Sequence, residues 1–121
     1  MRLPNGENAI VDINKLTKYC LNLDNPRGRH KARVFESALG ITSTQADKLH
    51  EQLLHVARIS ESAVAGENDA YGERYVVDFE WTTAKGTALV RSTWIVLNNE
   101  DTPRLTTCYV LKRRQDAQEE N

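Results

Sequence analysis

Apolar residues recur with a helical period in the first half of the chain and with a strand period in the second. Up to about residue 60, apolar side chains stand three or four positions apart, which is typical of amphipathic helices. From Glu73 onward every second residue tends to be apolar, which is typical of strands that bury one face. This order predicts an α+β fold, with about three N-terminal helices packed on one face of a C-terminal antiparallel β-meander of three to four strands. The other face of the sheet is expected to be solvent-exposed or a binding surface.

Three helices are predicted, over about residues 12–21, 29–39 and 41–63. Their end signals are the N-cap residue Asp12, the C-cap residue Gly40 and the capping-box pair Thr42 and Gln45. The loop between the first two helices contains Asn-Pro followed by a glycine, a combination that favours a turn. In the third helix the apolar residues form one stripe, namely Ala46, Leu49, Leu53, Val56 and Ala57. This stripe is expected to be buried.

Strands are predicted over about residues 74–82, 87–97 and 105–111. The first of them places its large apolar residues on one face: Tyr75, Val77, Phe79 and Trp81. The second is mostly apolar on both faces, so it is expected to be the central strand.

Two registers are possible for the hairpin between the first two strands. Gly86 suits a three-residue loop, Ala84 to Gly86, with the glycine in the left-handed region. That loop would place Arg91 opposite Phe79, whereas a two-residue loop would place Arg91 opposite Asp78. A shift of one residue exchanges the two faces of a strand, so the loop length decides which residue Arg91 meets.

The composition fits a single soluble domain. The chain has 121 residues, a formal net charge of −1 and an apolar content of 40%. The domain is predicted over residues 1–111, followed by a polar tail at 112–121 that is expected to be disordered. The near-neutral charge gives no global attraction to nucleic acid. The first residues contain no long apolar run, so no secretory signal and no membrane anchor are expected, and a cytoplasmic location is predicted.

Neither a metal site nor a cofactor site is expected from the sequence. Cys20 and Cys108 match no metal-ligand spacing and are predicted to be buried free thiols, because a disulfide suits a reducing cytosol poorly. Two of the three histidines, His50 and His55, are predicted at the core edge and at the surface. No glycine loop for a dinucleotide or a nucleoside triphosphate is present.

The segment NPRGRHKARVF, from Asn25 to Phe35, carries the first candidate chemistry. It gathers Arg27, Arg29, His30, Lys31 and Arg33 at the predicted start of the second helix. On a helical projection Lys31 lies close to the direction of the apolar face, whereas Arg33 points away. The free N–H groups of a first helical turn also favour anions, so Lys31 and His30 could bind a phosphate there, with Arg27 and Arg29 as further anion-binding residues. Alternatively, Lys31 only covers apolar surface with its stem and the arginines are solvated.

Three more candidates lie on the predicted strands. Arg91 on the central strand could hold an oxyanion or a phosphate, and Ser92 beside it and Thr107 on the last strand could orient a substrate. The alternative for Arg91 is a structural pair with a carboxylate. The alternative for Thr107 is that threonine is simply a common strand residue.

Several blocks of the chain resemble an uncharacterised bacterial domain family whose members typically read LPNAEKAV…KL.DYLLNP.HP.G.HKARVF. The matching blocks are LPNGENAIVDINKLTKYCLN, NPRGRHKARVFESALGIT, YGERYVVDFE, VRSTWIV and PRLTTCYVL, and together they span about residues 2–111. One departure is Asn25, because the family often has a histidine before the proline. The family occurs as small stand-alone proteins and at the C-terminal tips of polymorphic toxins.

The resemblance implies a toxin-like function. The order of helices followed by an antiparallel sheet is similar to the barnase–EndoU–colicin–RelE ribonucleases, which cleave RNA without a metal. On that reading His30 is the general acid or base, and Lys31 and Arg91 stabilise charge on the phosphate. RNA would be the substrate, and a cognate antitoxin or immunity protein the partner. The alternative is a non-enzymatic domain that binds a protein partner through the same basic turn.

Overall fold

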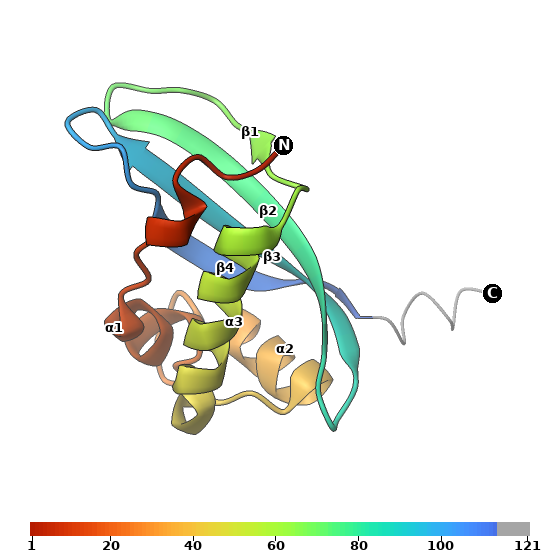
Figure 1. The fold of residues 1–121 in the computed structure, drawn as a ribbon. Helices are drawn as coiled ribbons and strands as arrows, with labels where there is room; N and C mark the ends of the chain where they lie inside the picture. Colours follow the sequence, from red (N-terminus) through yellow and green to blue (C-terminus); the bar gives the residue numbers. More distant parts are fainter. Residues whose placement is uncertain (114–121) are drawn as a thin grey trace.

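The computed structural model describes residues 1–113 and shows helices packed on one face of a curved, four-stranded antiparallel sheet (Figure 1). The sheet has the order β1-β2-β3-β4, with strands β1 (Val64–Ala65), β2 (Gly72–Thr82), β3 (Thr87–Leu97) and β4 (Arg104–Arg113). The helices are α1 (Ile13–Lys15), α2 (Arg29–Leu39) and α3 (Ala46–Ile59), with a π-helix η2 (Leu16–Cys20) and short 3₁₀ turns η1 (Gly6–Asn8) and η3 (Ser43–Gln45). The predicted α+β fold class is therefore confirmed.

The first predicted helix is a single α-helical turn that widens into a π-helix. Asp12 is its N-cap, as predicted, and its carboxylate accepts a hydrogen bond of 2.9 Å from the N–H of Asn14. Farther along, the N–H of Leu21 donates to the carbonyl of Leu16 at 2.9 Å, which is the i→i+5 bond of a π-helix. Because this turn is wider, Leu16, Leu21 and Cys20 are all buried. The π-helix thus directs Cys20 toward the sheet.

The second helix matches its predicted bounds, whereas the third is shorter than predicted: α3 covers Ala46–Ile59 after the 3₁₀ turn η3, and residues 60–63 are not helical. Gly40 ends α2 with a φ of 68°, the left-handed conformation expected of a C-cap glycine. The capping box of Thr42 and Gln45 is present before α3, with the N–H of Thr42 donating to the Gln45 side chain at 2.9 Å. All five residues of the predicted stripe are buried. The stripe and the buried face of α2 meet the sheet in one hydrophobic core.

The register of the β2–β3 hairpin places Arg91 opposite Asp78. The strands end at Thr82 and Thr87, and the loop closes with a 2.8 Å bond from the N–H of Thr83 to the carbonyl of Gly86. Gly86 does not adopt a positive φ, so the predicted left-handed glycine is wrong. Gly86 instead allows a close approach, because a Cβ at this position would lie 3.0 Å from the Ala38 carbonyl, a tight contact. The hairpin tip is pressed against the end of α2.

The core occupies the space between the helices and the sheet. Trp94 and Phe35 are among its largest fully buried side chains. As predicted, β3 is an inner strand, with β2 on one side and β4 on the other. The helices cover one face of the sheet and leave the other face uncovered (Figure 1). Asp78, Arg91 and Thr93 are half-buried and alternate along their strands with buried core residues, so they lie on the uncovered face. This face is open to solvent or to a partner.

The last strand extends slightly beyond the predicted domain boundary. Lys112 and Arg113 belong to β4, and the rest of the predicted tail, 114–121, lies outside the described residues. Among the helices of residues 1–113, none is long and apolar enough to cross a membrane.

Candidate functional site

Asn25 organises the loop that leads into α2. Its side-chain oxygen accepts hydrogen bonds from the N–H groups of Arg27 at 2.9 Å and Gly28 at 3.0 Å, and its amide nitrogen donates to the carbonyl of Lys18 at 3.1 Å. Gly28 permits the close approach, because a Cβ there would lie 2.7 Å from the Tyr19 carbonyl. The loop is therefore held against the end of η2, and the first turn of α2 lies beside the edge strand β4.

A surface hollow of about 170 Å³ lies where η2, this loop, α2 and β4 meet. Its lining residues are Tyr19, Cys20, Asn25, Arg27, Gly28, Lys31, Thr107 and Cys108. Three of the residues predicted from the sequence, Arg27, Lys31 and Thr107, therefore line one hollow, although they come from a loop, a helix and a strand. The hydroxyl of Thr107 lies 3.8 Å from the Cys20 sulfur.

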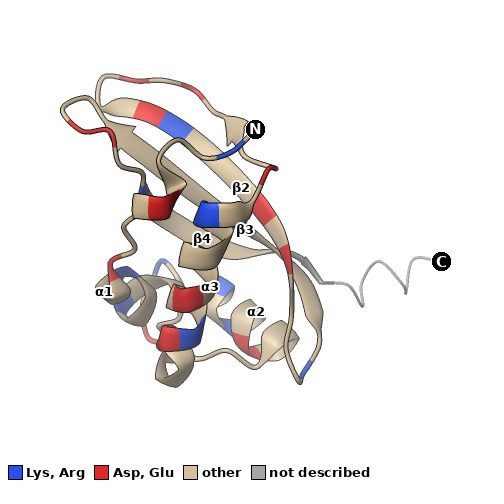
Figure 2. Ribbon diagram, in the orientation of Figure 1, with Lys and Arg blue, Asp and Glu red and all other residues tan. Residues whose placement is uncertain are grey.

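Lys31 faces the sheet edge, as its position on the helical projection predicted. Its Nζ atom lies 4.3 Å from the centre of the Tyr109 ring, which is within the range of a cation–π contact. The side chain remains exposed. Arg29 and His30 precede it on the same first turn and are also exposed. Figure 2 marks the Lys and Arg residues of α2 in blue along the ribbon. This end of α2 therefore presents several cations and one titratable imidazole to solvent.

Arg91 reaches the same tyrosine from the neighbouring strand. It stands opposite Tyr109 in the β3–β4 pairing, and its guanidinium forms two hydrogen bonds of 2.8 Å with the carboxylate of Asp78. Asp78 and, to a smaller extent, Tyr109 raise the pKa of Arg91 above its already high value. The structural ion pair considered for Arg91 is therefore present. Two of the five guanidinium N–H groups form the bidentate pair with Asp78, and the side chain is 36% exposed.

Ser92 lies inside the core, away from the hollow. Its relative exposure is 0%, its hydroxyl donates to the Val77 carbonyl at 2.7 Å, and it accepts a 2.9 Å hydrogen bond from the indole nitrogen of Trp94. Both roles of the hydroxyl are used inside the protein. Ser92 therefore has no direct access to a substrate and supports the sheet beneath Arg91.

Replacing Ser92 by alanine is expected to lower the free energy of unfolding by about 1–3 kcal/mol, because the Trp94 N–H would lose its only acceptor in a buried site. Urea denaturation of both proteins measures this change. The control is Ser37→Ala, since Ser37 is exposed and its substitution should change stability little. An unchanged unfolding midpoint for Ser92→Ala would contradict the structural role.

Of the residues that line the hollow, Cys20 and Cys108 have the shifted pKa values. The pKa of the Cys20 thiol is lowered to about 6, first by the thiol of Cys108 and then by the Cys108 backbone N–H, with smaller effects of Thr107 and Lys15. The pKa of Cys108 is raised by the Cys20 sulfur and by burial. Both cysteines are free and buried, which confirms the prediction made for them. Of this pair, Cys20 is thus the group that carries thiolate character.

Tyr109 and Asn25 were not among the predicted site residues. Tyr109 meets Arg91 only because the β3–β4 register shifts between Thr93 and Trp94, and no residue type in the sequence signals that irregularity. The role of Asn25 could have been inferred, because asparagine before proline often bonds to the backbone of the following residues. The other two histidines lie elsewhere: His50 bonds the Val11 carbonyl at 2.9 Å, and His55 is exposed.

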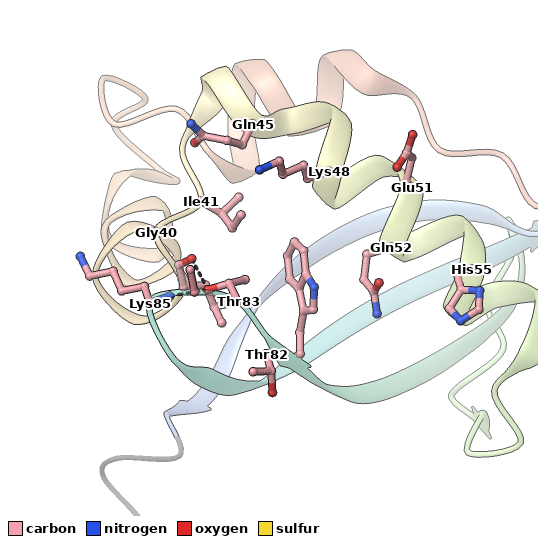
Figure 3. Close-up of a pocket in the computed structure, with 13 residues that line it drawn as sticks. Gly40, Ile41, Gln45, Lys48, Glu51, Gln52, His55, Thr82, Thr83 and Lys85 are labelled. Carbon is pink, nitrogen blue, oxygen red and sulfur yellow. Dashed lines mark hydrogen bonds between the residues drawn. The ribbon is translucent and has the colours of Figure 1, made fainter.

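A larger groove of about 660 Å³ lies between α3 and the β2–β3 hairpin (Figure 3). The side chains that line it come from α3, from the α2–α3 connection and from the hairpin: Leu39, Gly40, Ile41, Gln45, Lys48, Glu51, Gln52, His55, Trp81, Thr82, Thr83, Ala84 and Lys85. It shares no residue with the hollow at the β4 edge. No group of three or more His, Cys, Asp and Glu side chains that could hold a metal ion occurs in the part of the chain that the structure describes.

Comparison with known proteins places this arrangement in a family. The family model described as a domain of unknown function, DUF6883, matches residues 2–112. The chain belongs to the DUF6883 family. No curated protein matches the sequence of this DUF6883 domain.

Among solved structures, the DUF6883 domain is similar to a chain in a contact-dependent growth inhibition toxin–immunity protein complex from Klebsiella pneumoniae 342. The two chains are 17% identical, with a TM-score of 0.66, and the match covers 84% of this chain and 98% of the other. At this identity the similarity shows a shared fold.

Proposed function

We propose that this DUF6883 domain is a metal-independent endoribonuclease, the toxin of a bacterial toxin–antitoxin or competition system. The observation that carries the proposal is the convergence of Lys31 and Arg91 on Tyr109, beside the exposed His30 and the hollow that Arg27 and Thr107 line. An RNA phosphate at this edge would meet cations from α2 and from β3. The fold shared with a chain of a toxin–immunity complex supports a role in the same kind of system, with a cognate immunity protein or antitoxin as partner.

The proposed chemistry needs groups that move one proton and stabilise one phosphate. His30 accepts the proton of the ribose 2′-OH, because an imidazole nitrogen can act as a general base. Lys31 and the N–H groups of Arg91 that do not pair with Asp78 stabilise the charge that develops on the phosphate oxygens. Thr107 orients the phosphate by its hydroxyl, and Arg27 and Arg29 attract the RNA backbone. Ser92 contributes indirectly, by fixing the strand that carries Arg91.

A protein-interaction domain, immunity-like or partner-binding, is the second candidate. It is favoured by the open face of the sheet, where Val64 is 63% exposed and pairs with the half-buried Val76. Apolar residues on an unpaired sheet face suit contact with another protein. In that case the basic turn at the start of α2 would bind an acidic surface rather than RNA.

Inducible expression in a bacterium distinguishes the two candidates. Wild-type protein is expected to arrest growth and fragment total RNA, and His30→Ala is expected to abolish both effects, because the proton transfer is lost. His55→Ala is the matched control, since His55 is also an exposed histidine but lies on a different helix, α3, and it should remain toxic. Normal growth with intact RNA, despite abundant folded wild-type protein, would reject the nuclease and favour the interaction domain.

A further inference from the structure

The only two cysteines of the chain, far apart in sequence, lie side by side in the fold. Cys20 is the last residue of the π-helix η2, and Cys108 lies in the middle of the edge strand β4. Both line the same hollow, and the Cys20 sulfur lies 3.8 Å from the hydroxyl of Thr107, the residue next to Cys108 on β4. Two thiols that line one hollow from different elements are candidates for a disulfide between those elements.

The two thiols differ in access and in charge. Cys20 is 6% exposed and faces the hollow, whereas Cys108 is 1% exposed. A hollow of about 170 Å³ admits a molecule of the size of water or hydrogen peroxide, since one water occupies about 30 Å³ in the liquid. Lys15 of α1 acts electrostatically on the Cys20 thiol, and Arg27 of the loop and Lys31 of α2 line the same hollow. Neighbouring cations favour a thiolate, which is the form that attacks peroxide.

We propose that Cys20 and Cys108 form a peroxide-reactive pair, in which Cys20 is oxidised first and Cys108 closes an intramolecular disulfide between η2 and β4. The Cys20 thiolate attacks one oxygen of hydrogen peroxide, so that the O–O bond breaks, an S–O bond forms, and the hydroxide released takes up a proton to become water. The Cys108 sulfur then attacks the Cys20 sulfenic acid. The S–S bond forms, the S–O bond breaks, and the hydroxide leaves as water with the proton of Cys108.

The proposal goes beyond the nuclease function and does not depend on it. The disulfide would tie the N-terminal π-helix to the last strand, and the closed loop would include most of the domain. A cross-link that closes a long loop restricts the unfolded chain, so the oxidised protein should be the more stable form.

Treatment of the purified wild-type protein with hydrogen peroxide, followed by intact-mass measurement, tests the pair. The expected product is a monomer that has lost two hydrogens, unfolds at a higher temperature and returns to its original mass and unfolding temperature with dithiothreitol. A wild-type protein that keeps both thiols, or that gains oxygen atoms without losing hydrogens, would overturn the proposal. Both readouts are independent of RNA cleavage, so a failure of the nuclease proposal leaves this test unaffected.

Two single variants separate the roles of the sulfurs. Cys108→Ser should stop at the sulfenic acid and be labelled by dimedone, whereas Cys20→Ser should stay reduced, because Cys108 is almost fully buried. The alanine variants at both positions provide a second pair if a serine perturbs folding, which circular dichroism detects. Equal labelling of the Cys20 and Cys108 variants would contradict the assigned order of oxidation.

Discussion

Replacing Lys31 by alanine is expected to lower the rate of RNA cleavage by about 10²- to 10³-fold, the usual effect of removing one group that stabilises transition-state charge. Lys31 is placed for this role by its helix: it faces β4, its ammonium group lies over Tyr109, and its side chain is exposed. The fold should be retained, because an exposed cation–π contact contributes only about 0.5–1 kcal/mol. Cleavage rates of the purified proteins on one RNA substrate give the measurement.

Arg33→Ala is the matched control for Lys31→Ala. Arg33 is an exposed cation on the same helix and lies outside the hollow. Its loss changes the net charge by the same amount, so a general electrostatic attraction of RNA would be weakened equally in both variants. Equal losses of activity would show that the charge of α2, and not the position of Lys31, determines cleavage.

Replacing Trp94 by alanine is expected to lower the free energy of unfolding by about 3–5 kcal/mol, as for other fully buried aromatic residues. Trp94 has a relative exposure of 0% on the inner strand β3, and its indole nitrogen bonds Ser92 at 2.9 Å. The substitution would therefore have two effects: it would leave a cavity in the middle of the core, and it would remove the hydrogen bond from Trp94 to Ser92. Chemical denaturation followed by circular dichroism measures the loss.

Trp81→Ala serves as the comparison for Trp94→Ala. Trp81 is only half-buried and forms part of the wall of the groove beside α3, so its loss should cost clearly less. The difference between the two tryptophans follows from their burial alone. Similar losses at both positions would contradict the placement of the core.

The parts of the fold that local patterns determine could be predicted from the sequence. Gly40 and the Thr42–Gln45 pair mark helix ends by local chemistry, and the stripe of α3 follows from its spacing, so these features were predicted correctly. The two-residue strand β1 was missed, because a pair of residues carries no period. The turn at Gly86 was assigned the wrong conformation, since its geometry depends on contact with the Ala38 carbonyl of α2 rather than on local preference.

In the candidate site too, features set by local sequence could be predicted, and features set by tertiary contacts could not. The direction of Lys31 follows from helical geometry and could be predicted. The burial of Ser92 could be anticipated only from its place on an inner strand, where hydroxyls bond within the sheet. The meeting of Arg91 with Tyr109, and of Cys20 with Cys108, depends on the irregular register of β4 and on the π-helix. The register shift of β4 and the π-helix both result from tertiary packing, and no pattern in a single sequence predicts them.

The central claim, that this domain cleaves RNA without a metal, is tested most directly with the purified protein. Total bacterial RNA is incubated with the protein in the presence of EDTA, and the RNA and its new ends are analysed on a gel and by end-labelling. The account predicts cleavage that EDTA does not inhibit and fragments that end in a cyclic or 3′ phosphate, the products of attack by the 2′-OH. RNA that stays intact at high concentrations of folded protein, or cleavage that EDTA abolishes, would contradict it.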